Sequence, residues 1–230
     1  MIRLDNVSKT LKGRDVLCGV SLMADSGQIL GLQGANGSGK TMILRVLAGF
    51  VHATSGNVEV NGRVLSRGAQ FPSSLGVLIE SPEFLPHYTG LENLKLLASI
   101  RRVIGYEDVR EWLARVGLDP DDGRTFKKYS LGMRQRLGLA AAFMEQPDVV
   151  LLDEPTNALD PEGIAMVKRE VLCCKERGAA VVVACHDASV LEDVADEIAV
   201  MAEGRIIGWR SGEDILVEKR EGEVMGCEVS

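Results

Sequence analysis

Aromatic residues make up only 4% of this 230-residue sequence, and long hydrophobic runs are missing from it. The longest apolar runs, at 137–144 and 179–185, are far shorter than the roughly 20 residues that a membrane-spanning helix needs. Residues 1–5 carry no apolar signal region. Lysine and arginine form no continuous stripe, and the net charge of −7 argues against binding to nucleic acid or anionic lipid. We therefore expect neither direct membrane insertion nor a nucleic-acid partner.

Cysteine is also scarce, and its spacing fits neither a disulfide framework nor a metal site. The five cysteines are odd in number and mostly lie inside apolar runs: Cys18, Cys173, Cys174, Cys185 and Cys227. This pattern predicts reduced, buried thiols of the kind found in cytosolic proteins. The sequence is 46% hydrophobic and 26% charged, which is ordinary for a globular α/β protein with one large core.

One glycine-rich segment fills every fixed position of the phosphate-binding pattern G-x-x-x-x-G-K-[ST]. Its residues are Gly34, Ala35, Asn36, Gly37, Ser38, Gly39, Lys40 and Thr41. An apolar run at 29–32 precedes it as a strand, and 42–47 follows with helical spacing. In this pattern backbone amides converge on phosphate oxygens, Lys40 neutralises the β and γ phosphates, and Thr41 holds Mg²⁺. A glycine-rich turn that merely opens a helix is the alternative, but the strand–loop–helix context favours a bound nucleoside triphosphate.

Three further polar groups follow predicted strands. Asp153 and Glu154 come directly after the apolar residues 149–152, and His186 follows the strand at 181–184. Ligands of parallel sheets lie outside the carboxyl ends of the strands, so these side chains should face the phosphate loop. We expect Asp153 to hold Mg²⁺, Glu154 to deprotonate the attacking water and His186 to contact the γ-phosphate. The alternatives are a carboxylate pair that caps the next helix and a histidine with a structural role.

The apolar pattern predicts a parallel α/β core with a β layer at its start and a helical insertion in its middle. Short strands are expected at 2–7, 16–23, 57–60 and 75–79, with a hairpin turn at Asn61 and Gly62. Helical spacing runs from 89 to about 117, where Thr89 and Glu92 fit a capping box. After Ser130, helices at 131–145, 161–177 and 189–195 alternate with apolar strands at 149–152, 181–184 and 198–201.

The segment Tyr129-Ser130-Leu131-Gly132-Met133-Arg134-Gln135 resembles the Leu-Ser-Gly-Gly-Gln signature of ATP-binding cassette (ABC) proteins. The serine and the second glycine match, while Tyr129, Leu131 and Met133 depart from it. A serine N-cap that opens a helix is the plainer interpretation, and both can hold. Asn157-Ala158-Leu159-Asp160 is similar to the family's D-loop, although serine is more usual than Asn157. With the phosphate loop, the strand-end acids and His186, the resemblance covers nearly the whole chain.

The resemblance implies a fold, a partner and a set of roles. The fold would be an ABC-type P-loop NTPase in one domain, with residues 1–80 and 130–230 as catalytic core and β layer and 81–129 as helical subdomain. The chain would act as a head-to-tail dimer with itself or with a homologous subunit. In that dimer, Ser130 and Gly132 would close over the γ-phosphate bound to the other subunit.

Two departures from the family pattern are informative. The family has an aromatic residue that stacks on adenine near the start of the domain, where this sequence has Leu11. The family's Q-loop glutamine, which contacts Mg²⁺ and the attacking water, is replaced by Glu80, followed by Ser81-Pro82. This glutamate resembles the bacitracin-resistance and lantibiotic-immunity exporter ATPases. A carboxylate is also a better Mg²⁺ ligand than an amide, so Glu80 is expected to have catalytic and metal-binding roles.

The sequence thus indicates a Mg²⁺-dependent ATPase that powers export, of an antimicrobial peptide or similar amphiphile, through separate membrane permease subunits. The permease would hold it at the cytoplasmic face of the membrane and would dock near residues 84–88, unless those side chains pack internally. Two rival functions are a soluble ABC ATPase of translation or DNA repair and a nucleotide-binding regulator that does not hydrolyse ATP. Co-purification with an integral membrane protein would separate the first interpretation from both rivals.

Overall fold

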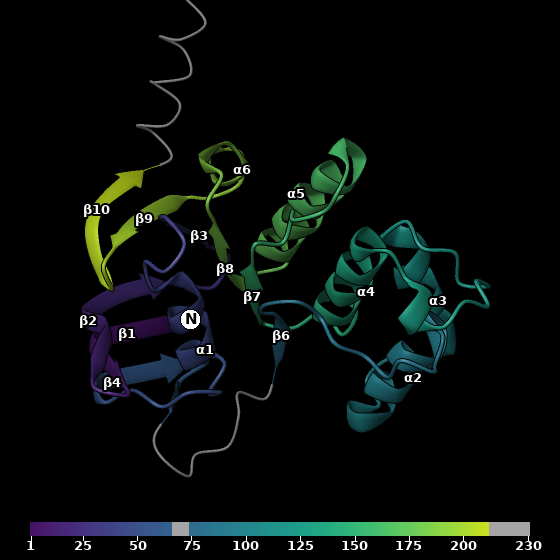
Figure 1. Ribbon diagram of the computed structural model, residues 1–230, viewed down its shortest axis with the longest axis horizontal. Helices are drawn as coiled ribbons and strands as arrows, with labels where there is room; N and C mark the ends of the chain where they lie inside the picture. The colour runs from purple at the N-terminus through teal and green to yellow at the C-terminus, as the bar shows by residue number, and fades with distance from the viewer. Residues whose placement is uncertain (66–73, 212–230) are drawn as a thin grey trace, which may run out of the picture.

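The computed structural model describes residues 1–65 and 74–211, which form two sheets flanked by helices (Figure 1). The first sheet is antiparallel, with the order β2 (Arg14–Ala24), β1 (Ile2–Leu11), β4 (Ser55–Val60) and β5 (Arg63–Val64). The second sheet has the order β10 (Arg205–Ser211), β9 (Glu197–Ala202), β3 (Ile29–Gln33), β8 (Ala180–Cys185), β7 (Val149–Asp153) and β6 (Leu75–Leu78). Its strands are parallel except β10, which pairs antiparallel with β9.

The helices divide into two groups (Figure 1). α2, α3 and α4 form a helical group at the end of the molecule opposite to β1, β2 and β4, whereas α1, α5 and α6 pack against strands of the six-stranded sheet. The helix bounds are α1 (Lys40–Leu47), α2 (Gly90–Arg101), α3 (Tyr106–Arg115), α4 (Leu131–Phe143), α5 (Pro161–Glu176) and α6 (Ala188–Glu192), with a short 3-10 helix at Phe126–Lys128. Within the described part of the chain, no helix is both long and apolar enough to cross a bilayer.

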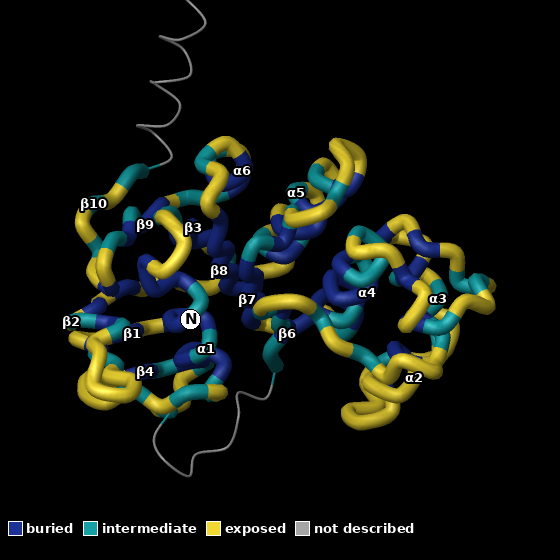
Figure 2. The backbone as a smooth tube through the Cα atoms, in the orientation of Figure 1, coloured by how far each residue is buried: buried dark blue, intermediate teal, exposed yellow. Residues whose placement is uncertain are grey.

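Two hydrophobic cores lie on opposite faces of the six-stranded sheet, because successive side chains of a strand point to opposite faces. On β7, Val149 and Leu151 face α1 and the antiparallel sheet, while Val150 and Leu152 face α4 and α5. β8 alternates in the same way. Figure 2 shows β7 and β8 buried throughout, between more exposed helices. Burial on both faces explains the nearly continuous apolar runs of these strands.

The predicted starts of several elements are confirmed. Thr89 and Glu92 form a reciprocal capping box at α2, and Ser130 caps α4 through its side chain. The turn at Asn61 and Gly62 joins β4 to β5, with both residues at positive φ as a tight hairpin requires. Cys18, Cys173, Cys174 and Cys185 are free thiols, as predicted, and Cys227 lies outside the described residues. Cys174 and Cys185 are buried as expected, whereas Cys18 and Cys173 are only partly buried.

The helical spacing at 89–117 covers two helices rather than one. Arg102 ends α2 in the left-handed conformation, with φ 57°, and α3 begins at Tyr106. The two helices pack on α4, where Trp112 stacks on Phe143 with ring centroids 6.1 Å apart. α4 also packs against β6 and so connects α2 and α3 to the six-stranded sheet, while the boundary at residue 129 stays a prediction.

Residues 84–88 include one side chain that packs internally and two that are exposed, so each alternative stated for this segment holds for part of it. Phe84 packs inward, with its ring 5.3 Å from that of Phe126 in an edge-on contact. Leu85 and Tyr88 are 49% and 43% exposed. Internal packing therefore accounts for Phe84, and an apolar surface remains at its neighbours.

The contact between β6 and α4 yields a stability prediction. A Cβ atom on Gly76 would lie 2.0 Å from the carbonyl oxygen of Ala142, so Gly76→Ala must displace backbone. We expect it to lower the free energy of unfolding by about 1–3 kcal/mol, the usual cost of overpacking. Urea unfolding monitored by circular dichroism measures the loss. The control is Gly208→Ala on β10, where a Cβ would meet no heavy atom within 4 Å; equal stability of the two variants would contradict the packing argument.

Candidate nucleotide site

The glycine-rich segment forms the connection between β3 and α1, at the carboxyl edge of the parallel strands. Gly39 precedes the helix with φ 108°, a conformation that residues with side chains rarely adopt. A Cβ on Gly34 would lie 2.4 Å from the carbonyl oxygen of Met201, so close packing also requires glycine there. Lys40 is 5% exposed, and its ammonium group donates to the carbonyl oxygens of Gly34 at 2.5 Å and Ala35 at 3.3 Å.

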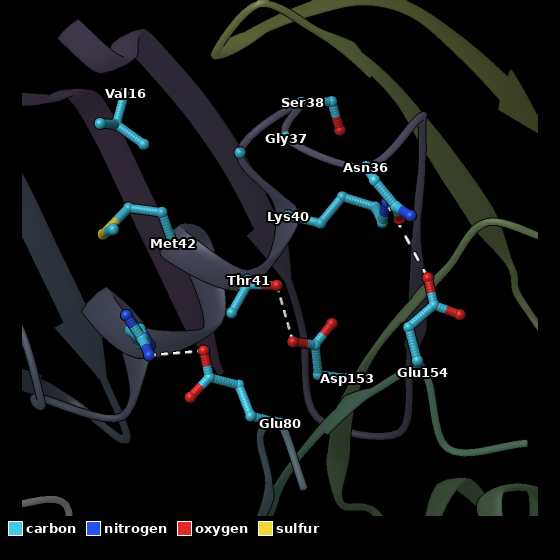
Figure 3. Close-up of a pocket in the computed structure, with 12 residues that line it drawn as sticks. Val16, Asn36, Gly37, Ser38, Lys40, Thr41, Met42, Glu80, Asp153 and Glu154 are labelled. Carbon is cyan, nitrogen blue, oxygen red and sulfur yellow. Dashed lines mark hydrogen bonds and ion pairs between the residues drawn. The ribbon is translucent and has the colours of Figure 1, made fainter. Parts of the chain in front are cut away.

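A cavity of about 320 Å³ lies beside this loop (Figure 3). Its lining residues come from β2, the loop with α1, and the ends of β6 and β7: Val16, Asn36, Gly37, Ser38, Gly39, Lys40, Thr41, Met42, Arg45, Glu80, Asp153 and Glu154. The buried hydroxyl of Ser38 and the Oε1 atom of Glu154 have no hydrogen-bond partner in the described structure. Unpaired buried polar atoms are costly, so this edge of the cavity is built for a polar ligand.

Thr41 and Asp153 join the loop to the end of β7. The Thr41 hydroxyl donates to Asp153 Oδ2 at 2.7 Å, and Asp153 is 7% exposed. Burial raises the pKa of Asp153 above its ordinary value, while the hydrogen bond from Thr41 opposes the rise. A hydroxyl and a carboxylate side by side are the oxygen donors that Mg²⁺ prefers, so these residues fit that ion.

Glu154 and His186 meet at the ends of β7 and β8, as the strand pattern predicts. His186 Nδ1 lies 2.8 Å from Glu154 Oε2, and Lys40 Nζ lies 4.0 Å from Glu154 Oε1. The Glu154 amide donates to the carbonyl oxygen of Ala184 at 2.8 Å, which fixes the glutamate to the neighbouring strand. The neighbouring Cys185 thiol is buried, which raises its pKa to about 11 and keeps it protonated at neutral pH.

Glu80 follows β6 and borders the same cavity. Its side chain is 58% exposed. No sequence motif indicates its partner, Arg45, whose Nη2 lies 2.6 Å from Glu80 Oε1. The only signal available was the position of Arg45, four residues after Thr41 and therefore on the same face of α1.

The signature segment begins α4 and is not part of the lining of the phosphate-loop cavity of the same chain. Ser130 and Leu131 are exposed, and neither Ser130 nor Gly132 lines the loop cavity. The Ser130 hydroxyl accepts a hydrogen bond from the Met133 amide at 3.2 Å. A Cβ on Gly132 would lie 2.8 Å from the carbonyl oxygen of Ala158, so the glycine allows the helix to approach the D-loop segment.

Two side chains of α4 connect the signature helix to the residues after β7. Gln135 Nε2 donates to the carbonyl oxygens of Glu154 at 3.2 Å and Pro155 at 3.0 Å. Arg136 donates to the Val116 carbonyl oxygen at 2.7 Å and to Asp160 Oδ1 at 2.6 Å. Neither contact was predicted from the sequence, although Gln135 belongs to the signature segment.

Leu11 is not brought to the cavity. It lies at the end of β1, opposite Arg14 in the hairpin, and is 39% exposed. Val16, on the returning strand β2, lines the cavity instead. The contact between Leu11 and a base therefore stays a prediction, and Val16 joins it as a second candidate.

Comparison with known proteins agrees with this geometry. A family model described as ABC transporter matches residues 17–157. The ABC transporter ATP-binding protein YybJ of Bacillus subtilis is 38% identical over 95% of this chain and 99% of its own length. The bacitracin transport ATP-binding protein BcrA of Enterococcus faecalis is 36% identical over 90% of this chain and 68% of its own length. The lantibiotic transport ATP-binding protein SrtF of Streptococcus pyogenes is 34% identical over 90% of this chain and 89% of its own.

Solved structures share the fold. The dimeric structure of MJ0796, a bacterial ABC transporter cassette, matches with a TM-score of 0.83 and 25% identity over 92% of this chain and 99% of its own. The structure of an ATP-binding subunit of an ABC transporter matches with a TM-score of 0.85 and 23% identity over 96% of this chain and 93% of its own. The predicted α/β cassette with a parallel core and an antiparallel β layer is thereby confirmed.

The place of Leu11 yields a binding prediction. If a base stacks near the β1–β2 hairpin, Leu11→Tyr should tighten ATP binding several-fold, because stacking on a base contributes roughly 1–3 kcal/mol. Equilibrium titration with a fluorescent ATP analogue measures the change. Ile207→Tyr, at an exposed strand position on β10, is the control for a general effect of an added tyrosine. An unchanged dissociation constant for Leu11→Tyr would assign the base contact to another residue, with Val16 the first to test.

Proposed function

This chain belongs to the ABC transporter family as an ATP-binding subunit, and from that premise we propose that it hydrolyses ATP to power export through separate membrane subunits. The observation that carries the proposal is the position of Glu154 at the phosphate-loop cavity, between His186 and Lys40. A carboxylate beside a phosphate-binding lysine and an imidazole is suited to accept the proton of a water that attacks the γ-phosphate.

The loop residues 34–41 would hold the phosphates of ATP through their backbone amides and the start of α1. Lys40 would exchange its two carbonyl acceptors in the loop for β- and γ-phosphate oxygens. Thr41, Asp153 and Glu80 would hold Mg²⁺, which supplies charge neutralisation at the phosphates when bound.

Glu154 would orient the attacking water and take up its proton, and His186 would contact the γ-phosphate. The bond between His186 Nδ1 and Glu154 Oε2 keeps both groups in one orientation before the substrate arrives. The Oε1 atom of Glu154 is the atom we assign to the water, because no described residue donates a hydrogen bond to it and Lys40 lies 4.0 Å away.

A second copy of an ATPase subunit would complete the site. Ser130 and Gly132 lie at the exposed start of α4, where amide groups and the helix dipole favour an anion, yet they do not line the cavity of their own chain. A head-to-tail dimer, with itself or with a homologous subunit, would bring them to the nucleotide of the partner. The dimeric arrangement reported for MJ0796 supports this proposal.

The partner in the membrane would be a permease, and the cargo an antimicrobial peptide or similar amphiphile. Relatives named for bacitracin and lantibiotic transport support this cargo class. The exposed side chains of Leu85 and Tyr88, beside the helical group, offer an apolar surface to such a permease. Docking there would place the subunit at the cytoplasmic face of the membrane, with residues 81–129 moving against a core of 1–80 and 130–230.

Replacing the proposed base separates binding from chemistry. Glu154→Gln should retain ATP binding and lower turnover by about 10²–10⁴-fold, the usual contribution of general base catalysis. Phosphate release at saturating ATP measures turnover, and gel filtration with ATP should show a trapped dimer. Glu162→Gln, which alters an exposed acid in the first turn of α5, should keep wild-type activity. Near-normal hydrolysis by Glu154→Gln would remove Glu154 from the role of base. Absence of hydrolysis in the wild-type chain itself would favour the regulator without turnover.

Mixing two inactive variants tests whether the site is shared. Lys40→Ala removes the phosphate lysine, and Ser130→Arg blocks the signature segment, so each homodimer should lack both sites. A mixed dimer would keep one site intact, with Lys40 from one subunit and Ser130 from the other, and partial activity should return. The control mixes Lys40→Ala with a subunit that carries both changes, which leaves every combination defective. Mixed dimers that form without any recovery would mean that the two motifs do not build a common site.

A further inference from the structure

Arg45 is the second cation that lines the phosphate-loop cavity, beside Lys40. It lies on α1, one turn after Thr41, so the helix that carries the hydroxyl of the cavity also presents this guanidinium to it. Its Nη2 donates to Glu80 Oε1 at 2.6 Å, the contact drawn beside Glu80 in Figure 3.

The cavity is lined by more carboxylates than cations. Three carboxylates line it, those of Glu80, Asp153 and Glu154. Lys40 is occupied by the loop carbonyls and lies 4.0 Å from Glu154. Arg45 is the ion-pair partner of Glu80 among the described residues, so it neutralises the carboxylate that Lys40 does not reach.

Glu80 depends on a partner for its position. It leaves β6 with φ 62°, a left-handed backbone conformation, and its side chain is 58% exposed. An exposed glutamate ordinarily samples several rotamers, and fixing one has an entropic cost. The bond to Arg45 selects the rotamer in which one carboxylate oxygen is held, while the second takes no hydrogen bond from the described residues.

We propose that Arg45 is a positioning residue that holds Glu80 beside Thr41 and Asp153, so that the divalent cation accompanying ATP meets three protein oxygen groups instead of two. This inference rests on the proposed ATP-binding function. A hydroxyl and two carboxylates are hard oxygen donors of the kind that Mg²⁺ prefers. The arrangement makes the glutamate at this position act together with an arginine on α1, and the two residues form one functional unit.

The size of the expected effect follows from exposure. Arg45 is 34% exposed and Glu80 58% exposed, so their pair is screened by water and contributes little to folding. Replacing Arg45 should therefore leave the fold intact and alter only the orientation of Glu80. We expect a change of about two- to fivefold in a Mg²⁺-dependent affinity, the range for losing an exposed ion pair.

The test is the affinity for a fluorescent ATP analogue, measured once with Mg²⁺ and once with EDTA. Arg45→Met should weaken binding about two- to fivefold with Mg²⁺ and leave binding in EDTA unchanged. Glu80→Ala should reproduce this loss, and the double variant should be no weaker than Glu80→Ala alone. Arg45→Lys, which keeps the charge without the planar fork, should fall between Arg45→Met and the wild type.

Arg101→Met is the control, because the Arg101 side chain is exposed to a similar degree, 38%, and forms an ion pair with Glu145, 2.7 Å away, on a helix outside the cavity. It should bind as the wild type does in both conditions. Equal loss for Arg45→Met in EDTA and in Mg²⁺ would overturn the proposal and assign Arg45 to the nucleotide itself. Independent, additive losses for Arg45→Met and Glu80→Ala would also overturn it. A wild-type chain that binds no ATP in either condition would instead refute the proposed function, and the role of Arg45 with it.

Discussion

The hydrogen bond between Thr41 and the buried carboxylate of Asp153 is the constraint on which the rest of the site depends. A carboxylate that is 7% exposed needs a partner, and the hydroxyl at the start of α1 supplies it. This bond fixes α1, and with it the phosphate loop, against the end of β7. Lys40 reaches Glu154 and Arg45 reaches Glu80 because both cations lie on the helix so fixed. Replacing the helix by a loop would separate all three pairs.

Much of the architecture could be predicted because the periodicity of the sequence reports burial. The strands β7 and β8 are apolar except at Asp153, the last residue of β7, and the structure shows two cores that divide their apolar residues alternately. The loop at 34–41 and the acids after β7 could also be located, since their order follows from the topology of a parallel sheet. Glu154 and His186 could be expected on the same side of the sheet because parallel strands have their carboxyl ends at one edge.

Other features depended on contacts that no pattern encodes. β10 was not predicted, because residues 205–211 do not alternate regularly between polar and apolar side chains. Their pairing with β9 makes them a strand. The pairing of Arg45 with Glu80 joins residues 35 positions apart, on elements whose spacing only the folded chain defines. Leu11 illustrates the opposite problem. Its position in the sequence suggested a contact with the base, but the residue of this hairpin that lines the cavity is Val16, on β2. The break between α2 and α3 was hidden because apolar spacing continues across it.

The arginine contact between α3 and the D-loop segment limits how this fold can be recombined. Arg136 takes the Val116 carbonyl as one acceptor and Asp160 as the other, and Gly117 has φ 77° with space for no Cβ beside the guanidinium. Residues 116 and 117 follow α3, whereas Arg136 lies on α4 and Asp160 caps α5. A chimera that exchanges α2 and α3 between relatives would have to keep the glycine and the carbonyl geometry together with the arginine. One backbone position, Gly117, therefore restricts which α2–α3 segments this fold can accept.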